Sequence, residues 1–310
     1  MNSVKFILQL IHAAYVEWGH DRAARLGAAI AYYALFSLAP MLFILIAIAG
    51  GIYGEAAAKG QIVHLISDQV GPPAALAVEA MLAGVHAEPG TSLITTLISA
   101  VILIYGATNL FSQLRDALNT LWNVRPKPYE HIFGSVLILV RDRFLSALMV
   151  IALSILLLLA WALSVGLTVL SGWLNTIIIP GTTFLLGGGN VLIGFGLTTL
   201  MFALMFKILP DVQVAWRVVW VGALVTSILF NIGAFLIGLY LGFGGAQSVL
   251  GAAGSFVILM IWISYSAQII FFGAKFALVY AASIGKPIVP AAHAVGIKLS
   301  RLETTPTDQE

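Results

Sequence analysis

The sequence has very little charge for its length. Among 310 residues, 15 are Lys or Arg and 13 are Asp or Glu, so 9% are charged, whereas a soluble domain has about 25%. Residues 26–54, 89–114, 144–206 and 218–274 contain no charged side chain at all. A water-facing surface cannot be built from this supply. The shortage excludes a soluble enzyme, a disordered chain and a nucleic-acid-binding domain, and it indicates an integral membrane protein.

Cysteine is absent as well, which excludes disulfides, zinc–thiolate sites and a cysteine nucleophile. The six histidines are scattered without an HxxxH or HExxH motif, and no pair of carboxylates falls in an apolar run. A Walker-type phosphate loop is also missing. We therefore expect no catalytic residue, no metal, no cofactor and no ATP-driven step, and we expect the chain not to be an enzyme.

The charge-free runs predict an all-α, polytopic bundle of six transmembrane helices. A spanning helix needs about 20 apolar residues, so the two shorter runs hold one span each and the two longer runs hold two each. The apolar stretches are continuous rather than alternating, which favours helices over barrel strands. The predicted spans are Ala28 to Ile52, Thr91 to Phe111 (its helix continuing through Leu121), Phe144 to Leu170, Asn190 to Lys207 after a break at Gly187–Gly189, Val218 to Leu241, and Leu250 to Ala281.

Three regions are predicted along the chain. Residues 1–27 form a cytoplasmic amphipathic surface helix, because apolar residues recur there every three or four positions. Residues 28–282 form the transmembrane domain. Within it, residues 55–88 carry four acids and the breaker Gly71-Pro72-Pro73, which indicates two short amphipathic helices on the outer surface. Residues 283–310 are polar and are predicted to be a disordered cytoplasmic tail.

The distribution of Lys and Arg predicts the orientation. If the N-terminus lies in the cytoplasm, every Lys and Arg except Lys59 falls on the inner side of the six predicted spans. Inner loops of membrane proteins carry this excess of positive charge. We therefore expect both termini to be cytoplasmic.

Polar residues at the inner ends of the spans are candidates for substrate binding. Arg115 and Asn119 share one helix face, and form either a headgroup-binding patch or an ordinary helix end emerging into water. Lys207 and Arg217 flank a turn and either line a substrate groove or anchor that turn. Asp211, within the turn, can pair with either of these two cations. Pro210 and Asp211 are assigned structural roles, since Pro210 stops the helix.

Three more polar residues lie inside the predicted spans. Asn231 and Gln268 are amides in apolar helices, and either join helices or continue a polar path through the bundle. Lys275 lies on the same side of its helix as Gln268, and it either belongs to that path or extends to the inner interface. Structural roles are assigned to Pro40, which should kink the first span, and to small residues that permit close helix packing, namely Gly238, Gly242, Gly251 and Gly254.

Four motifs resemble, in order, those of the YihY/BrkB family of bacterial inner-membrane proteins. They are RAARLGAAIAYYALFSLAP at Arg22–Pro40, Gln113–Asn123, Leu209-Pro210-Asp211 with Trp216-Arg217, and Gly251–Ser255 with Trp262, Tyr265–Gln268 and Phe272–Ala274. The resemblance covers about Arg22 to Ala282. It implies six membrane helices with both ends cytoplasmic, in a bacterial inner membrane. This chain departs from the family's usual pattern at Lys275, where an acid is common, and at Leu250, where Tyr is frequent.

The resemblance does not specify a chemistry. Some members carry the name ribonuclease BN, others are linked by name to virulence, and some are suspected of moving lipids or envelope precursors. We do not expect ribonuclease activity or a nucleic-acid partner here. The basic inner ends of the spans favour a transporter or flippase-like protein for an amphipathic, anionic envelope lipid. The alternative is a non-catalytic membrane scaffold, in which these cations merely follow the positive-inside rule. The oligomeric state is not specified.

Overall fold

The computed structural model describes residues 3–70, 72–83, 93–127, 182–242 and 247–296, together with isolated helical residues between Phe144 and Gly166. These ranges are mostly α-helical, as predicted. The helices are α1 (Ser3–His20), α2 (Ala23–Tyr53), α3 (Glu55–Val70), α4 (Pro72–Ala83), α5 (Leu93–Leu121), α7 (Thr182–Ile208), α8 (Trp216–Gly242) and α9 (Gln247–Ser283). The strands are β1 (Val124–Pro126), β2 (Val212–Gln213), β3 (Val289–Pro290) and β4 (Ala294–Gly296).

Three of the described helices are long and apolar enough to cross a membrane. The qualifying stretches are Val191–Ile208, Trp216–Leu236 and Val257–Ser283, and α2 adds a shorter apolar stretch, Ala23–Leu38. The predicted third span, Phe144 to Leu170, falls largely outside the described residues. The count of six spans therefore stays a prediction.

The ends of the helices follow from residues that the backbone requires there. Helix α2 ends at Tyr53, and the next residue, Gly54, has a positive φ of 89° and donates its N–H to the Gly50 carbonyl. Helix α7 ends at Ile208, just before Pro210, as predicted. Its start differs from the prediction, because the helix begins at Thr182 and passes through the expected break at Gly187–Gly189. Glycine disfavours a helix by only about 1 kcal/mol per residue, so an apolar environment can offset it.

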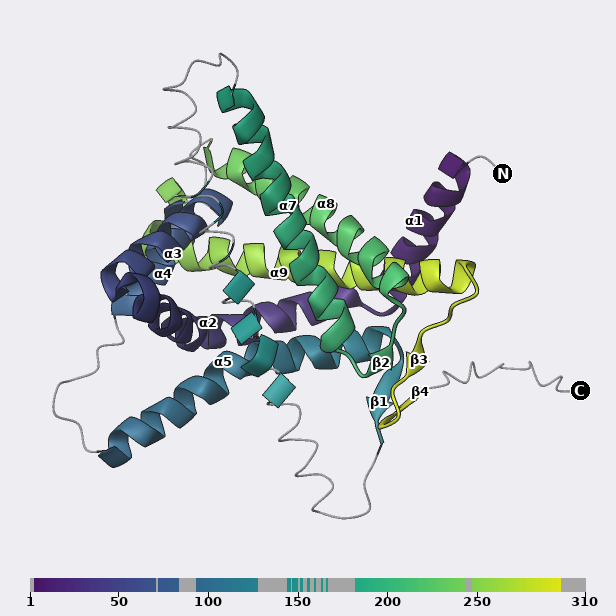
Figure 1. Ribbon diagram of the computed structural model, residues 1–310, viewed down its shortest axis with the longest axis horizontal. Coiled ribbons are helices and arrows are strands. Elements are labelled where there is room, and N and C mark those ends of the chain that lie inside the picture. The colour runs from purple at the N-terminus through teal and green to yellow at the C-terminus, as the bar shows by residue number, and fades with distance from the viewer. Residues whose placement is uncertain are drawn as a thin grey trace, which may run out of the picture.

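Helices α3 and α4 are joined at the prolines, as predicted, and they also pack into the protein core. Val78 of α4 is fully buried in a cluster with Leu42 and Ile46 of α2 and Ile62 of α3. Ala77 of α4 packs against α9 in a second cluster. In Figure 1 these two short helices lie at one end of the bundle, whereas α1 and the four strands lie at the opposite end.

The segment after α9 contains two short strands, β3 and β4, where the sequence led us to expect a disordered tail. Strand β3 pairs with β2 in the turn between α7 and α8, and strand β4 pairs with β1 after α5, both in antiparallel register. Helix α9 ends at Ser283, and Gly285, with a φ of 68°, turns the chain two residues later. The chain beyond α9 thus pairs with two segments that are far apart in the sequence, one after α5 and one between α7 and α8.

Candidate functional site

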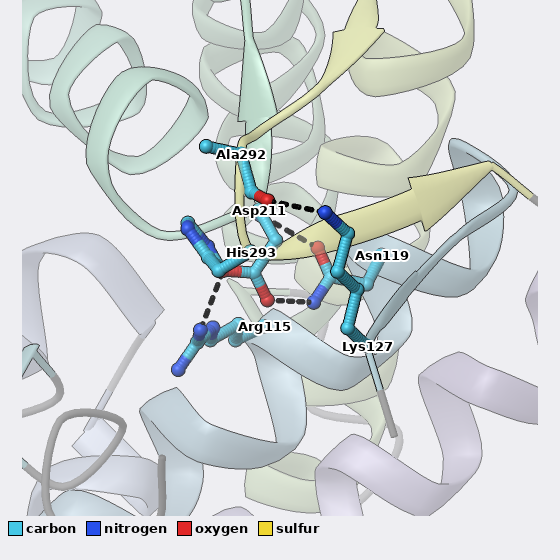
Figure 2. A network of polar contacts seen from close by, with 6 residues as sticks. All are labelled: Arg115, Asn119, Lys127, Asp211, Ala292 and His293. Atoms are coloured by element: carbon cyan, nitrogen blue, oxygen red, sulfur yellow. Dashed lines mark hydrogen bonds and ion pairs between the residues drawn. The ribbon is translucent and has the colours of Figure 1, made fainter. Parts of the chain in front are cut away.

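A group of four polar side chains, three of them buried, lies where α5, the α7–α8 turn and the β3–β4 segment meet, and we call it the Asp211 cluster. Its members are Arg115, Asn119, Asp211 and His293 (Figure 2). The Arg115 guanidinium lies 2.6 Å from Asp211 Oδ1, and His293 Nε2 lies 2.6 Å from the same oxygen. The Arg115 and Asp211 side chains are 2% and 1% exposed, so this ion pair is withdrawn from water.

Asn119 holds Asp211 through both its backbone and its side chain. Its Nδ2 donates to Asp211 Oδ2 at 2.9 Å, and its Oδ1 accepts the Asp211 backbone N–H at 2.8 Å. Arg115 and Asn119 are one helical turn apart on α5, so both reach the same carboxylate. The shared face predicted from their spacing is confirmed.

The β3–β4 segment closes the cluster from the other side. The backbone N–H of Ala291 donates to the Asp211 carbonyl at 2.9 Å, and Lys127 Nζ donates to the Ala292 carbonyl at 2.8 Å. The Lys127 backbone N–H donates to the His293 carbonyl at 3.0 Å. Figure 2 shows the Lys127–Ala292 contact beside Asp211. His293, 31% exposed, is the member with most access to the surface.

The expected pairing of Asp211 with Lys207 or Arg217 is wrong. Lys207 Nζ donates to the Val214 carbonyl at 2.7 Å and lies 5.4 Å from the centre of the Trp216 ring. Arg217 is exposed on the first turn of α8. The carboxylate turns instead towards α5, because the strand pairing of the turn places Asp211 inside the protein.

Lys275 is completely buried, and its side chain reaches the acidic residues at the end of α1, the helix predicted to lie at the inner interface. Its Nζ forms a close ion pair with Asp21, just after α1, and lies 3.9 Å from Glu17 Oε2. Lys275, which stands where the family commonly has an acid, therefore has acidic partners within this chain. Lys275 joins α1 to α9 and is separate from the Asp211 cluster.

The two intramembrane amides do not form a common path. Asn231 is exposed on α8 and donates to the Ser227 carbonyl of its own helix at 2.8 Å. Gln268 donates to Ser264 Oγ at 3.4 Å, and its Cγ would lie 2.9 Å from a Cβ added to Gly27 of α2. Gln268 therefore joins helices, one of the two roles expected from the sequence.

The predicted structural residues have mixed outcomes. Pro40 lies inside α2, and its ring is so close to Gly106 of α5 that a Cβ there would come within 2.8 Å of it. Gly238, Gly242, Gly251 and Gly254 lie in α8 and α9, but their surroundings fall outside the described residues. Close packing is instead seen at other glycines, among them Gly222 and Gly273.

A small apolar pocket lies one helical turn from the Asp211 cluster. It is lined by Phe111, Met149, Ala152, Leu156, Met201, Leu204 and Met205. Phe111 precedes Arg115 by four residues on α5, so the two side chains are neighbours on one face. None of the residues predicted to bind a substrate lines this pocket. Within the described ranges, no group of three or more His, Cys, Asp or Glu could hold a metal ion.

His293 was missed by the sequence reasoning. It is a single histidine in a polar segment that also contains prolines, and nothing in that pattern indicates a buried partner. Asp211 gave a weak signal, because it directly follows a proline that stops a helix. If this acid were buried, it would need a cation and a hydrogen-bond donor as partners. The spacing of Arg115 and Asn119 pointed to the other half of the cluster.

A buried polar cluster, long apolar helices and apolar outer faces define a helical integral membrane protein. The chain belongs to the virulence factor BrkB family, whose model matches residues 14–296. It is 28% identical over 256 residues to a UPF0761 membrane protein of Pseudomonas paraeruginosa, covering 82% of this chain and 58% of that protein. It is 24% identical over 267 residues to a UPF0761 membrane protein of Tolumonas auensis, covering 83% and 80%.

The chain thus spans little more than half the length of the Pseudomonas relative. No solved structure matches the chain.

Proposed function

We propose that this chain is a transporter or flippase-like protein for an amphipathic lipid or envelope-related substrate in a bacterial inner membrane. The observation that carries the proposal is the apolar pocket beside the Asp211 cluster. An anionic lipid needs an apolar surface for its chains and a cationic or hydrogen-bonding group for its head. Phe111 in the pocket wall and Arg115 in the cluster offer these two environments on adjacent turns of α5.

The composition of the pocket suits an acyl chain. Three of its lining residues are methionines (Met149, Met201 and Met205), and this flexible, polarisable side chain adapts to ligands of irregular shape. The walls come from α5, from α7 and from the helical residues around Met149. A chain bound there would have its head near His293, the partly exposed member of the cluster.

We also propose six spans with both termini in the cytoplasm. The ends of the described chain support this topology, since α1 and the strands that follow α9 lie at the same end of the bundle (Figure 1). Exposed cations occur at that end, including Arg125, Lys127, Arg217 and Lys286. Lys59 belongs to α3 at the opposite end. This distribution is the one expected of a cytoplasmic face.

A membrane scaffold is the second candidate, and a specific observation favours it. The cations expected to line a substrate path are largely occupied within the chain: Arg115 by Asp211, Lys275 by Asp21 and Lys207 by the Val214 carbonyl. A bundle stabilised by such contacts can present surfaces to partners without moving any substrate.

Filling the pocket distinguishes the two candidates. Leu204→Trp adds an indole ring to the pocket wall, whereas Leu192→Trp makes the same change at an exposed position of α7. In liposomes with labelled anionic lipids, we expect Leu204→Trp to slow protein-dependent transbilayer movement by about tenfold, equivalent to about 1.4 kcal/mol of lost interaction. Leu192→Trp should move lipid at the wild-type rate.

Two results would contradict the transporter proposal. Wild-type protein that moves no lipid faster than protein-free liposomes would support the scaffold. Equal rates in the two Trp variants, with both correctly folded, would show that the pocket is not part of the route.

A further inference from the structure

Helix α8 presents a long apolar face to the outside of the bundle, and among the α8 residues whose exposure the structure describes one amide, Asn231, interrupts this face. Exposed apolar side chains follow one another at helical spacing, namely Trp216, Trp220, Leu224, Ile228, Ile232, Phe235, Leu236 and Leu239. This row is what a lipid-facing helix requires. Asn231 lies within it and is itself exposed.

The amide lies deep within the expected membrane. Trp216 marks the interface at the start of α8, and 15 residues of helix at about 1.5 Å each place Asn231 roughly 22 Å further on. The hydrocarbon core is about 30 Å thick, so Asn231 is still inside it. Polar side chains at such depths normally face another helix or a water-filled cavity.

The hydrogen bonds of Asn231 are incomplete within one copy of the chain. Its Nδ2 donates to the Ser227 carbonyl of the same helix at 2.8 Å. In the part of the chain that the structure describes, it contacts no polar group of another helix. The amide therefore retains one N–H donor and the Oδ1 acceptor, which lipid tails cannot satisfy.

We propose that this face of α8 is a symmetric interface with a second copy of the chain, joined by Asn231 of each copy. An asparagine side chain is self-complementary, because the donor of one can bond the acceptor of the other and the reverse about a two-fold axis. Ile228 and Phe235, 42% and 69% exposed, lie one turn to either side and supply apolar packing. The interface does not depend on the proposed lipid transport.

Disulfide cross-linking in native membranes tests this interface, because the chain has no cysteine of its own. We expect Ile228→Cys and Phe235→Cys to form a disulfide-linked product of twice the 33.0 kDa chain mass. Leu192→Cys, on the exposed face of α7 at 71% exposure, is the matched control and should cross-link only at the level of random collision.

A second substitution tests whether the Asn231 amide stabilises the interface. Asn231→Leu in the Ile228→Cys background should lower the association constant by roughly 3- to 20-fold, the range expected for an interhelical hydrogen bond in a membrane. Leucine at a lipid-facing position should leave folding intact. Cross-linking equal to the Leu192→Cys control, a product of a mass other than twice the chain, or no effect of Asn231→Leu would each overturn the proposal.

Discussion

Asp211 is a carboxylate in a place where a carboxylate is costly. Withdrawing a charge from water costs several kcal/mol, and one opposite charge offsets that cost only with good geometry and further hydrogen bonds. Asp211 has Arg115 and His293 on one oxygen and Asn119 on the other. Removing a partner of Asp211 therefore costs more stability than removing a surface charge, because it leaves a buried charge without its partner.

We expect Arg115→Met to lower the free energy of unfolding by about 3–5 kcal/mol, the usual loss when one partner of a buried ion pair is removed. Arg217→Met is the matched control, because Arg217 is exposed and surface changes alter stability by about 0.5 kcal/mol or less. Unfolding in mixed micelles, followed by tryptophan fluorescence, measures both variants. Adding Asp211→Asn to Arg115→Met should restore part of the loss, and equal stability of the two Arg variants would contradict the cluster.

At the residue scale, helical spacing predicted that Arg115 and Asn119 share a face, and the structure confirms it. Helical spacing could not identify the other two members, because Asp211 follows Asn119 by 92 residues and His293 follows Asp211 by 82. Nearby charges made Lys207 and Arg217 the obvious partners for Asp211. Strand pairing, which the sequence did not indicate, turned the carboxylate the other way.

At the scale of elements, helices α8 and α9 approach closely where two glycines face each other. A Cβ on Gly222 would lie 2.8 Å from Ala277 Cβ, and a Cβ on Gly273 would overlap Thr226 Oγ1. Thr226 cannot easily move aside, because its hydroxyl donates to the Gly222 carbonyl at 2.8 Å. Small residues of this kind let membrane helices pack backbone to backbone.

Gly273→Ala should therefore destabilise the protein by about 1–3 kcal/mol, the cost of overpacking a well-fitted contact. Gly196→Ala in α7 is the control, since a Cβ there meets no atom within 4 Å, and should be neutral or stabilising by up to about 1 kcal/mol. The same unfolding measurement compares the two. Adding Thr226→Ala to Gly273→Ala should recover stability, and a Gly273→Ala variant as stable as Gly196→Ala would refute the contact.

The helices were largely predictable wherever the sequence has long apolar runs or prolines that break a helix. Apolar runs predicted α2, α5, α8 and α9, and the prolines after Gly71 predicted the separation of α3 from α4. The strands were not predicted, because β2 and β3 have two residues each and no periodic pattern can show in so short a stretch. Their pairing joins segments that lie more than 70 residues apart.

On the scale of the whole molecule, the two ends of the bundle differ in kind. One end holds α1, the strands and the Asp211 cluster, and the other holds α3 and α4 with the Glu55–Lys59 ion pair (Figure 1). The polar contacts that join distant parts of the chain are concentrated at the first end. A membrane protein with this asymmetry has a face that is held together by polar bonds and a face that is held by apolar packing.

The orientation of these two ends can be tested with matched single cysteines in a chain that has none. Lys59→Cys lies in α3 and Lys286→Cys lies just after α9, and both positions are exposed or partly exposed. We expect a membrane-impermeant maleimide to label Lys59→Cys in cells whose inner membrane is intact, because the excess of cations at the strand end predicts that this end faces the cytoplasm. Lys286→Cys should be labelled only after that membrane is permeabilised. Labelling of Lys286→Cys in cells with an intact inner membrane would refute the cytoplasmic C-terminus, and labelling of both variants there would refute the odd number of spans predicted between them.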